Sequence, residues 1–181
     1  MMVAFIYKKT AFMKEIKLTQ GYIAKVDDDD FEKLSKHKWY AVVSKTKNLK
    51  RVYAVRMVRL GLNKRETIRM HRDILGIRDN NIKTDHKDHD TLNNQKSNIR
   101  QCTSSQNSLN IPSKIGSTSK YVGVSYIGEI KRKQKWLAKI EIQGKCHWIG
   151  RFYSEHDAAI ARDEYILKNN LEFPKLNILT R

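Results

Sequence analysis

Cysteine is scarce in this chain, and so are long apolar runs. Cys102 and Cys146 are its two cysteines among 181 residues, in segments that we expect to belong to different domains. Such a pair makes neither a disulfide framework nor a zinc site by its spacing, and it fits a reducing cytoplasm. No apolar run approaches the ~18 residues of a membrane-spanning helix, which argues against membrane insertion. The apolar stretch in residues 1–9 is too short for a convincing signal peptide.

Acidic residues are also in short supply. Lys and Arg number 36 against 19 Asp and Glu, which gives a formal net charge of +17. Such an excess indicates a polyanionic partner, with nucleic acid first and an anionic membrane surface second. The length allows one domain or two small ones, with room for a sizeable core.

The residue pattern predicts an α+β protein. Residues 14–60 alternate apolar and polar residues in short bursts rich in β-branched and aromatic side chains, which is typical of strands. The acidic run from Asp27 to Asp30 lies between two of these bursts. We interpret it as capping the positive end of a short helix rather than as a metal cluster. Residues 66–76 are expected to form a strand that passes into a short helix ending at Gly76.

Two domains are expected along the chain. The first spans 13–110, and residues 1–12 are a possible upstream extension of it. Residues 111–118 are expected to be a linker, because the stretch 108–119 holds four serines and Pro112, one of two prolines. The second domain spans 119–177.

This second domain is predicted to be a three-stranded antiparallel sheet packed on one helix. The strand candidates are 121–126, 136–142 and 147–152, with glycines in both intervening turns. The helix begins after Ser154, with Asp157 at the third position, and runs to about Asn169. Small alanines along it permit a close approach to the sheet.

The main chemical signal is a set of four polar residues: Asp85, His86, Asn98 and Asn107. A His beside a carboxylate, with an Asn fixed opposite, suits phosphodiester hydrolysis, since the base takes a proton from water while a divalent metal neutralises phosphate charge. Thr103 and Gln106 form a capping box, which starts a helix and places Asn107 in its first turns.

The order and spacing of these four residues resemble the HNH homing endonucleases of phages and introns, whose ββα-metal finger carries the metal and the general base. Residues 70–76 look like the His-Arg helix before that finger, and residues 16–21 are similar to the leader of the same group. The resemblance implies that Asp85 and Asn107 ligate the metal, that His86 is the general base, and that Asn98 fixes the loop and orients the base. Oxygen ligands favour Mg²⁺ or Mn²⁺ over zinc.

One position departs from the family pattern. His89 stands where these endonucleases commonly have a Gly that permits a turn with positive φ. His accepts such a turn only at some cost, so a strained or altered turn is one interpretation. The other is that His89 approaches the metal or a phosphate.

Residues 119–177 show a second resemblance, to the Apetala/ethylene-response-factor DNA-binding domain, which lays its three-stranded sheet in the major groove of DNA. This implies a stripe of DNA-contacting residues with salt-dependent affinity. Trp148 is expected in the core, and Trp136 is left open between core and DNA contact. The expected DNA-binding residues are Lys120, Lys131, Arg132, Lys133, Lys135, Trp136, Lys139, Lys145 and Arg151.

Together these observations predict a site-recognising DNA endonuclease of the HNH homing type, in the cytoplasm of a bacterial host or encoded by a phage. It would act on double-stranded DNA with one Mg²⁺ or Mn²⁺ per site, and it would need no small-molecule cofactor beyond the metal. A monomer carries one finger and should nick, whereas a double-strand cut would need a transient dimer or two binding events. The alternatives are a non-enzymatic DNA-binding regulator with a decayed nuclease unit and an RNA-binding protein.

Overall fold

The computed structural model describes residues 12–46, 49–62, 64–113, 116–128, 133–172 and 174–179. The chain divides into two compact units, Met1–Gln101 and Cys102–Arg181, and each is described by itself. The division lies ahead of the expected linker at 111–118, because the helix before that linker packs within the second unit. The possible extension at 1–12 lies outside the described residues except for Phe12, as do the expected DNA contacts Lys131 and Arg132.

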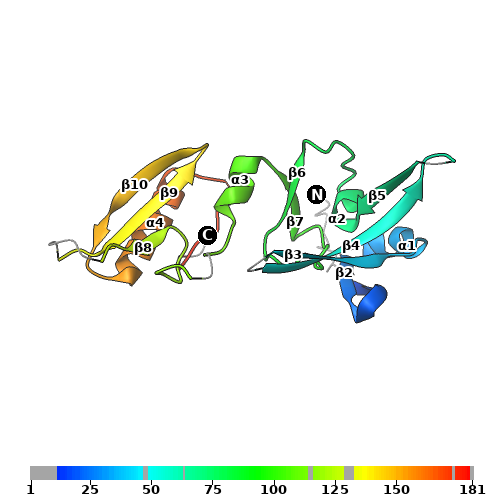
Figure 1. Cartoon of the computed structure of the whole chain (residues 1–181), viewed down its shortest axis with the longest axis horizontal. Coiled ribbons are helices and arrows are strands. Elements are labelled where there is room, and N and C mark those ends of the chain that lie inside the picture. The colour runs from blue at the N-terminus through cyan, green and yellow to red at the C-terminus, as the bar shows by residue number, and fades with distance from the viewer. Residues whose placement is uncertain are drawn as a thin grey trace, which may run out of the picture. The chain divides into compact units, whose positions relative to one another are not determined.

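The first unit is built on two antiparallel sheets (Figure 1). β1 (Met13–Lys17) pairs with β2 (Ile23–Asp27) across the 3-10 turn η1 (Thr19–Gly21), and α1 (Asp28–Ser35) follows β2 directly. β3 (Tyr40–Thr46), β4 (Leu49–Arg59) and β5 (Arg65–Arg69) form the second sheet in that order. The predicted strand-to-helix passage is confirmed, since β5 leads into α2 (Met70–Ile74) and Gly76 follows with φ 68°.

Apolar side chains from both sheets and both helices form one core in this unit. Their alternation along the strands turns one side of each sheet inward. Trp39 closes the core, and its indole N–H donates to the carbonyl of Leu34 at the end of α1 (2.8 Å). The buried members are Ile16, Leu18, Ala24, Val26, Leu34, Trp39, Ala41, Val52, Ala54 and Met70.

A short hairpin completes the first unit. β6 (Lys83–His86) pairs with β7 (Ile99–Cys102) in a two-stranded sheet, and the loop between them spans residues 87–98. α3 (Ser104–Leu109) follows in the chain and is counted with the second unit. The predicted capping box at its start is confirmed, because Thr103 Oγ1 accepts from Gln106 N and Gln106 Oε1 accepts from Thr103 N.

The second unit has the predicted architecture of three antiparallel strands and one helix. β8 (Val124–Tyr126), β9 (Trp136–Ile142) and β10 (Lys145–Phe152) form a sheet in the order β10-β9-β8, and α4 (Glu155–Lys168) packs on all three strands. β8 is shorter than the predicted strand 121–126. Ser154 caps α4 by accepting from the N–H of Asp157 (3.0 Å). Ala158 and Ala159 lie fully buried against Val124 and Ala138.

The two tryptophans of this sheet lie on opposite faces. Trp136 is opposite Phe152 in the register, and both pack against the cluster under α4. Trp148 is opposite Lys139 on the other face, and its side chain is 66% exposed. The prediction that Trp148 belongs to the core is wrong. Side chains alternate between the two faces along β10, so Trp148 points away from the helix-facing row to which Ile149 contributes.

A buried ion pair on α4 ties down the end of the chain. The carboxylate of Asp163 accepts from the backbone N–H groups of Asn177, Ile178 and Leu179, at 2.7 to 3.1 Å. Arg162 donates to the carbonyl of Lys175 (2.9 Å). Burial lowers the pKa of Arg162, which the neighbouring Asp163 partly offsets. These contacts close the second unit around α4.

Candidate active site

Asp85 and His86 lie at the end of β6, and both are buried. Arg100 is on the paired strand β7 and donates to one oxygen of Asp85, Oδ2, from Nε (3.0 Å) and from Nη2 (2.6 Å). A charge-assisted contact of this kind fixes the carboxylate and balances its charge in a setting with little water. The hairpin therefore holds Asp85 through an ion pair between its two strands.

The ring of His86 is held by Asn94 in the loop. Nε2 of His86 lies 3.5 Å from Oδ1 of Asn94, which is itself almost fully buried. Nδ2 of Asn94 donates to the carbonyl of Leu92 (3.0 Å), so the amide turns its oxygen toward the ring. An oxygen there accepts the proton on Nε2, and the neutral ring then carries its lone pair on Nδ1. Asn94 thus favours the tautomer that carries its proton on Nε2.

A second histidine supports the same ring from α2. The rings of His71 and His86 meet edge to face with centroids 4.8 Å apart, and the ring of Tyr53 packs on His71 with centroids 5.9 Å apart. Burial, together with His86 and nearby arginines, lowers the pKa of His71 to about 3. Burial also lowers the pKa of His86, although the Asn94 hydrogen bond and the neighbouring carboxylates act in the opposite direction. Both rings are therefore neutral at neutral pH.

Asn98 spans the loop between the two strands. Its Oδ1 accepts from the backbone N–H of Asp88 (3.0 Å), and its Nδ2 donates to Asp88 Oδ1 and to the carbonyl of Asn93, both at 2.8 Å. Burial alone would raise the pKa of Asp88, but hydrogen bonds from Asn93, the Asp90 N–H and Asn98 bring it below its ordinary value. Asn98 therefore shapes the loop, while Asn94 contacts the His86 ring.

The loop is also fastened to β2. Lys25 donates its N–H to the carbonyl of Leu92 and accepts from the N–H of Asn94, both at 2.8 Å. The carboxylate of Asp27 accepts from Gln95 Nε2 (3.1 Å) and from the backbone N–H of Lys96 (2.8 Å). The acidic run was expected to cap α1, and Asp28, Asp29 and Asp30 do lie in its first turn. The side chain of Asp27 instead holds the loop.

His89 occupies a turn with a left-handed backbone. Its φ is 66°, and its N–H donates to the carbonyl of His86 (3.1 Å). A turn with positive φ is therefore made here with His, at the conformational cost that a side chain brings to it. The interpretation of a strained turn is confirmed.

The two expected metal ligands belong to different units. Asp85 is on β6 in the first unit, and Asn107 is on α3 in the second, where its side chain is half-buried. In the parts of the chain that the structure describes, no group of three or more His, Cys, Asp or Glu could hold a metal ion. A carboxylate and an amide oxygen are each hard donors of the kind that Mg²⁺ and Mn²⁺ take.

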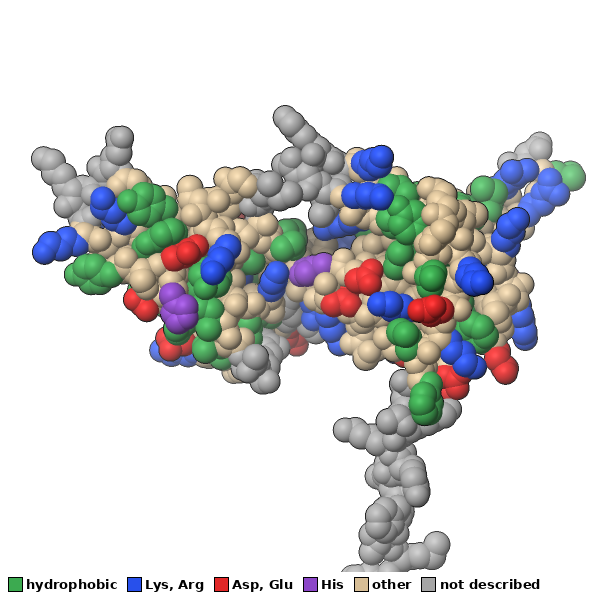
Figure 2. All heavy atoms as spheres, turned by 90° about the horizontal axis from the view of Figure 1, so that it is seen from below, with side chains coloured by type: hydrophobic (Ala, Val, Ile, Leu, Met, Phe, Trp, Pro, Cys, Tyr) green, Lys and Arg blue, Asp and Glu red, His purple; other side chains and the backbone are tan. Residues whose placement is uncertain are grey.

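The open face of the second sheet carries part of the expected DNA-binding stripe. Lys139 and Trp148 lie side by side across β9 and β10, and Arg151 follows on the same face. Lys120, Lys133 and Lys145 are exposed and Lys135 is half-exposed, whereas Trp136 lies on the opposite, helix-covered face. Figure 2 shows Lys and Arg side chains spread over the visible surface of each unit.

No family model, no curated protein and no solved structure matches this chain. Among the described residues, no helix is long and apolar enough to cross a membrane. The site is therefore interpreted from its own geometry.

Sequence reasoning missed three residues that surround His86 and Asp85. In the sequence, Asn94 stands out only as part of an Asn-Asn loop, and Arg100 is one of many basic residues. His71 is visible only as part of a helix 15 positions before His86. Arg100 could have been found from the hairpin, because a residue two positions after Asn98 lies on the strand opposite Asp85. His71 had no comparable signal, since the fold alone brings α2 against β6.

Proposed function

We propose that the chain is a metal-dependent DNA endonuclease that recognises a duplex site and hydrolyses a phosphodiester there. The observation that carries the proposal is the setting of His86, a buried imidazole that follows Asp85 in the chain and whose Nε2 faces Asn94. A general base must be unprotonated at working pH and held in one orientation; burial lowers the pKa of His86, and Asn94 contacts its ring.

In this mechanism Nδ1 of His86 takes the proton from the attacking water. Asn94 and the ring of His71 hold the imidazole while the proton moves. Asp85 would bind Mg²⁺ or Mn²⁺, which would supply charge neutralisation at the scissile phosphate when bound. Asn98 keeps the loop in the shape that this arrangement needs. One site per chain nicks one strand, so the proposed monomer leaves open circles from supercoiled DNA.

The second unit would bind the duplex, in the manner of the Apetala/ethylene-response-factor DNA-binding domain that its sequence resembles. Its open face offers Lys139, Trp148 and Arg151 in one patch. Basic side chains contact phosphates and hold the protein on the duplex, and an exposed aromatic ring adds contact area. The 36 basic residues outnumber the 19 acidic ones, and the resulting positive net charge attracts DNA at long range.

The test is a nicking assay on supercoiled plasmid at low salt, with Mg²⁺, with Mn²⁺ and with EDTA. His86→Ala should lower the rate by ~10²–10⁴, which is the usual contribution of a general base, and leave DNA affinity within about a few-fold. His37→Ala removes an exposed histidine of the same unit and serves as the control. Open circles that need both metal and His86 support the proposal. Linear product would mean paired action, and an equal loss of binding would mean that His86 is structural.

A non-enzymatic DNA-binding regulator is the second candidate. The observation in its favour is the contact of Arg100 with Asp85, because a guanidinium occupies an oxygen that a metal would use. A gel shift without any metal-dependent nicking would favour this second candidate.

A further inference from the structure

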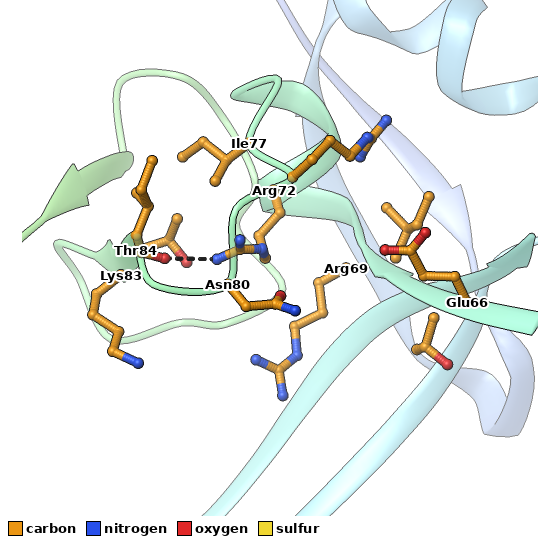
Figure 3. Close-up of a pocket in the computed structure, with 11 residues that line it drawn as sticks. Glu66, Arg69, Arg72, Ile77, Asn80, Lys83 and Thr84 are labelled. Carbon is orange, nitrogen blue, oxygen red and sulfur yellow. Dashed lines mark hydrogen bonds between the residues drawn. The ribbon is translucent and has the colours of Figure 1, made fainter.

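A basic pocket lies beside the candidate active site in the first unit. It has a volume of about 390 Å³ and is enclosed by β5, α2, the segment 77–82 and the start of β6. Arg69, Arg72, Asn80 and Lys83 line it, together with Thr67 and Thr84. Figure 3 shows Arg69, Asn80 and Lys83 around one opening, with Glu66 on the side away from Lys83.

One of these cations is fixed by the backbone. The guanidinium of Arg72 donates to the carbonyls of Ile82 (2.9 Å) and Asp79 (2.7 Å), so it holds the segment that forms one wall. Two neutral carbonyls do not cancel its charge. Arg72 therefore gives the pocket a fixed positive charge.

The other two cations face the opening without acidic partners. The guanidinium of Arg69 lies over the ring of Tyr53 at 5.0 Å, and Lys83 is exposed at the start of β6. Within the described part of the chain neither one forms an ion pair, in contrast to Arg78, which is paired with Asp73 at 2.7 Å. Four positive side chains thus line the hollow, of which Arg78 is paired with Asp73, and Glu66 is the one acid among the lining residues.

The donors around this hollow match a phosphate group. Guanidinium, ammonium, amide and hydroxyl groups are the side chains that contact DNA phosphates, and charge-assisted hydrogen bonds to them are the stronger kind. A phosphodiester also carries one negative charge at each nucleotide, so a hollow with net positive charge complements it without any particular base sequence.

The pocket's place on β6 relates it to the proposed cleavage. Lys83, which lines the pocket, and His86 lie on this same strand, three residues apart. We propose that this pocket binds a backbone phosphate of the duplex near the bond that is cut. The inference rests on the proposed function.

Such a contact would give the first unit its own hold on DNA, beside that of the second unit. The bound phosphate would set the distance between the pocket and His86 along the DNA strand. The pocket would then determine the register of the nick, in addition to contributing affinity.

The experiment compares two pairs of variants of the full chain by fluorescence anisotropy with a labelled DNA duplex. Asn80→Asp puts a negative charge into the pocket, and Asn81→Asp makes the same change at an exposed neighbour that does not line it. Arg69→Gln with Lys83→Gln removes two pocket cations, and Lys33→Gln with Lys36→Gln removes two exposed lysines at the end of α1. Circular dichroism melting checks that each variant is folded.

The pocket variants should bind about tenfold more weakly at low salt, as expected for lost charge-assisted hydrogen bonds. Their slope of log affinity against log salt should fall by about 0.9 in magnitude, which corresponds to one phosphate. The matched controls should change both quantities clearly less. Equal effects of pocket and control variants would overturn the proposal, because they would reduce the pocket to general surface charge.

Further arms separate the possible sources of phosphate. Inorganic phosphate, compared with chloride at equal ionic strength, should displace the duplex only weakly, because one ion replaces one contact among several. Strong displacement that the pocket variants abolish would assign the pocket to free phosphate and overturn the DNA assignment. A preference for duplex RNA that the same variants abolish would do so as well. Nicking of plasmid is scored separately, so pocket-dependent binding without nicking would leave the pocket standing and reject the nuclease.

Discussion

Arg100 donates two hydrogen bonds to a single oxygen of Asp85, at 3.0 and 2.6 Å. Both side chains are largely buried, with 14% and 9% of their surfaces exposed. The guanidinium therefore acts as the counter-charge of a carboxylate that is also the proposed metal ligand. A divalent ion and Arg100 would compete for the same group.

Arg100→Gln should expose this competition in thermal unfolding. Without metal it should lower the free energy of unfolding by about 3 kcal/mol, because a buried carboxylate loses its counter-charge. Saturating Mg²⁺ or Mn²⁺ should then raise the melting temperature of the variant more than that of the parent chain, since a ligand stabilises the state that binds it. Asp85→Asn combined with Arg100→Gln should lose the metal response. Equal metal responses in parent chain and single variant would contradict a metal site at Asp85.

His71 should make the first unit sensitive to mild acid. Its pKa is lowered to about 3 in the fold, mainly by burial with added effects of His86, Arg69 and Arg72, against 6.5 in an unfolded chain. The unfolded chain therefore takes up the proton first, and stability that is full above pH 6.5 is lost as the pH falls toward 3. Between pH 7 and pH 5 the loss from this one residue is about 2 kcal/mol.

The matching measurement is urea denaturation at both pH values. His71→Phe keeps a flat ring between Tyr53 and His86, and it should lose about 2 kcal/mol less than the parent chain on acidification. His37→Phe changes an exposed histidine and should behave as the parent chain does. If His71→Phe lost as much stability on acidification as the parent chain does, other groups would be responsible for the pH dependence.

The two tryptophans of the second unit should separate stability from DNA binding. Trp136→Ala should destabilise the fold by about 2 kcal/mol, because a partly buried ring leaves the cluster under α4. Trp148→Ala should change stability by less than about 0.5 kcal/mol, since its side chain is 66% exposed. It should instead weaken duplex binding about tenfold, as the loss of a central aromatic contact does. If Trp136→Ala instead weakened duplex binding and Trp148→Ala instead destabilised the fold, Trp136 would be the DNA contact.

Gly123 should tolerate no side chain. A Cβ there would collide with the carbonyl oxygen of Lys139 and lie 2.6 Å from Nε of Arg162, and its φ of 72° is unfavourable for other residues. Gly123→Ala should cost about 3 kcal/mol or more, the sum of backbone strain and overpacking. Gly144→Ala has a similar φ with open space around it, so it should cost only about 1 kcal/mol. Equal losses of unfolding free energy for the two variants in urea denaturation would show that the collision is not the cause of the loss.

Local signals in the sequence predicted local structure well. The Thr103–Gln106 box and the Ser154 cap depend on residues three positions apart, and both are present as expected. The left-handed turn at His89 is of the same kind, because one residue position determines the strain. Helix starts and turns are set by neighbours in the chain, which a single sequence displays.

Contacts between distant segments were the part that sequence reasoning missed. Trp148 and Trp136 could be assigned to opposite faces only with the register of β9 and β10 known. The ring of His71 on α2 contacts the ring of His86 on β6, and nothing in the spacing of the two residues predicts this contact. The sequence alone therefore identifies the proposed reacting residues of the candidate site. The residues that hold them in place become visible only in the fold.

The 87–98 loop is fastened to β2, and this affects any attempt to graft the β6–β7 hairpin onto another protein. The loop takes its shape partly from the backbone of Lys25 and the carboxylate of Asp27, which lie nearly 70 positions earlier in the chain. A peptide cut at the borders of the hairpin would leave these partners behind. Anyone grafting this hairpin onto another scaffold would have to bring β2 with it as a second, discontinuous piece.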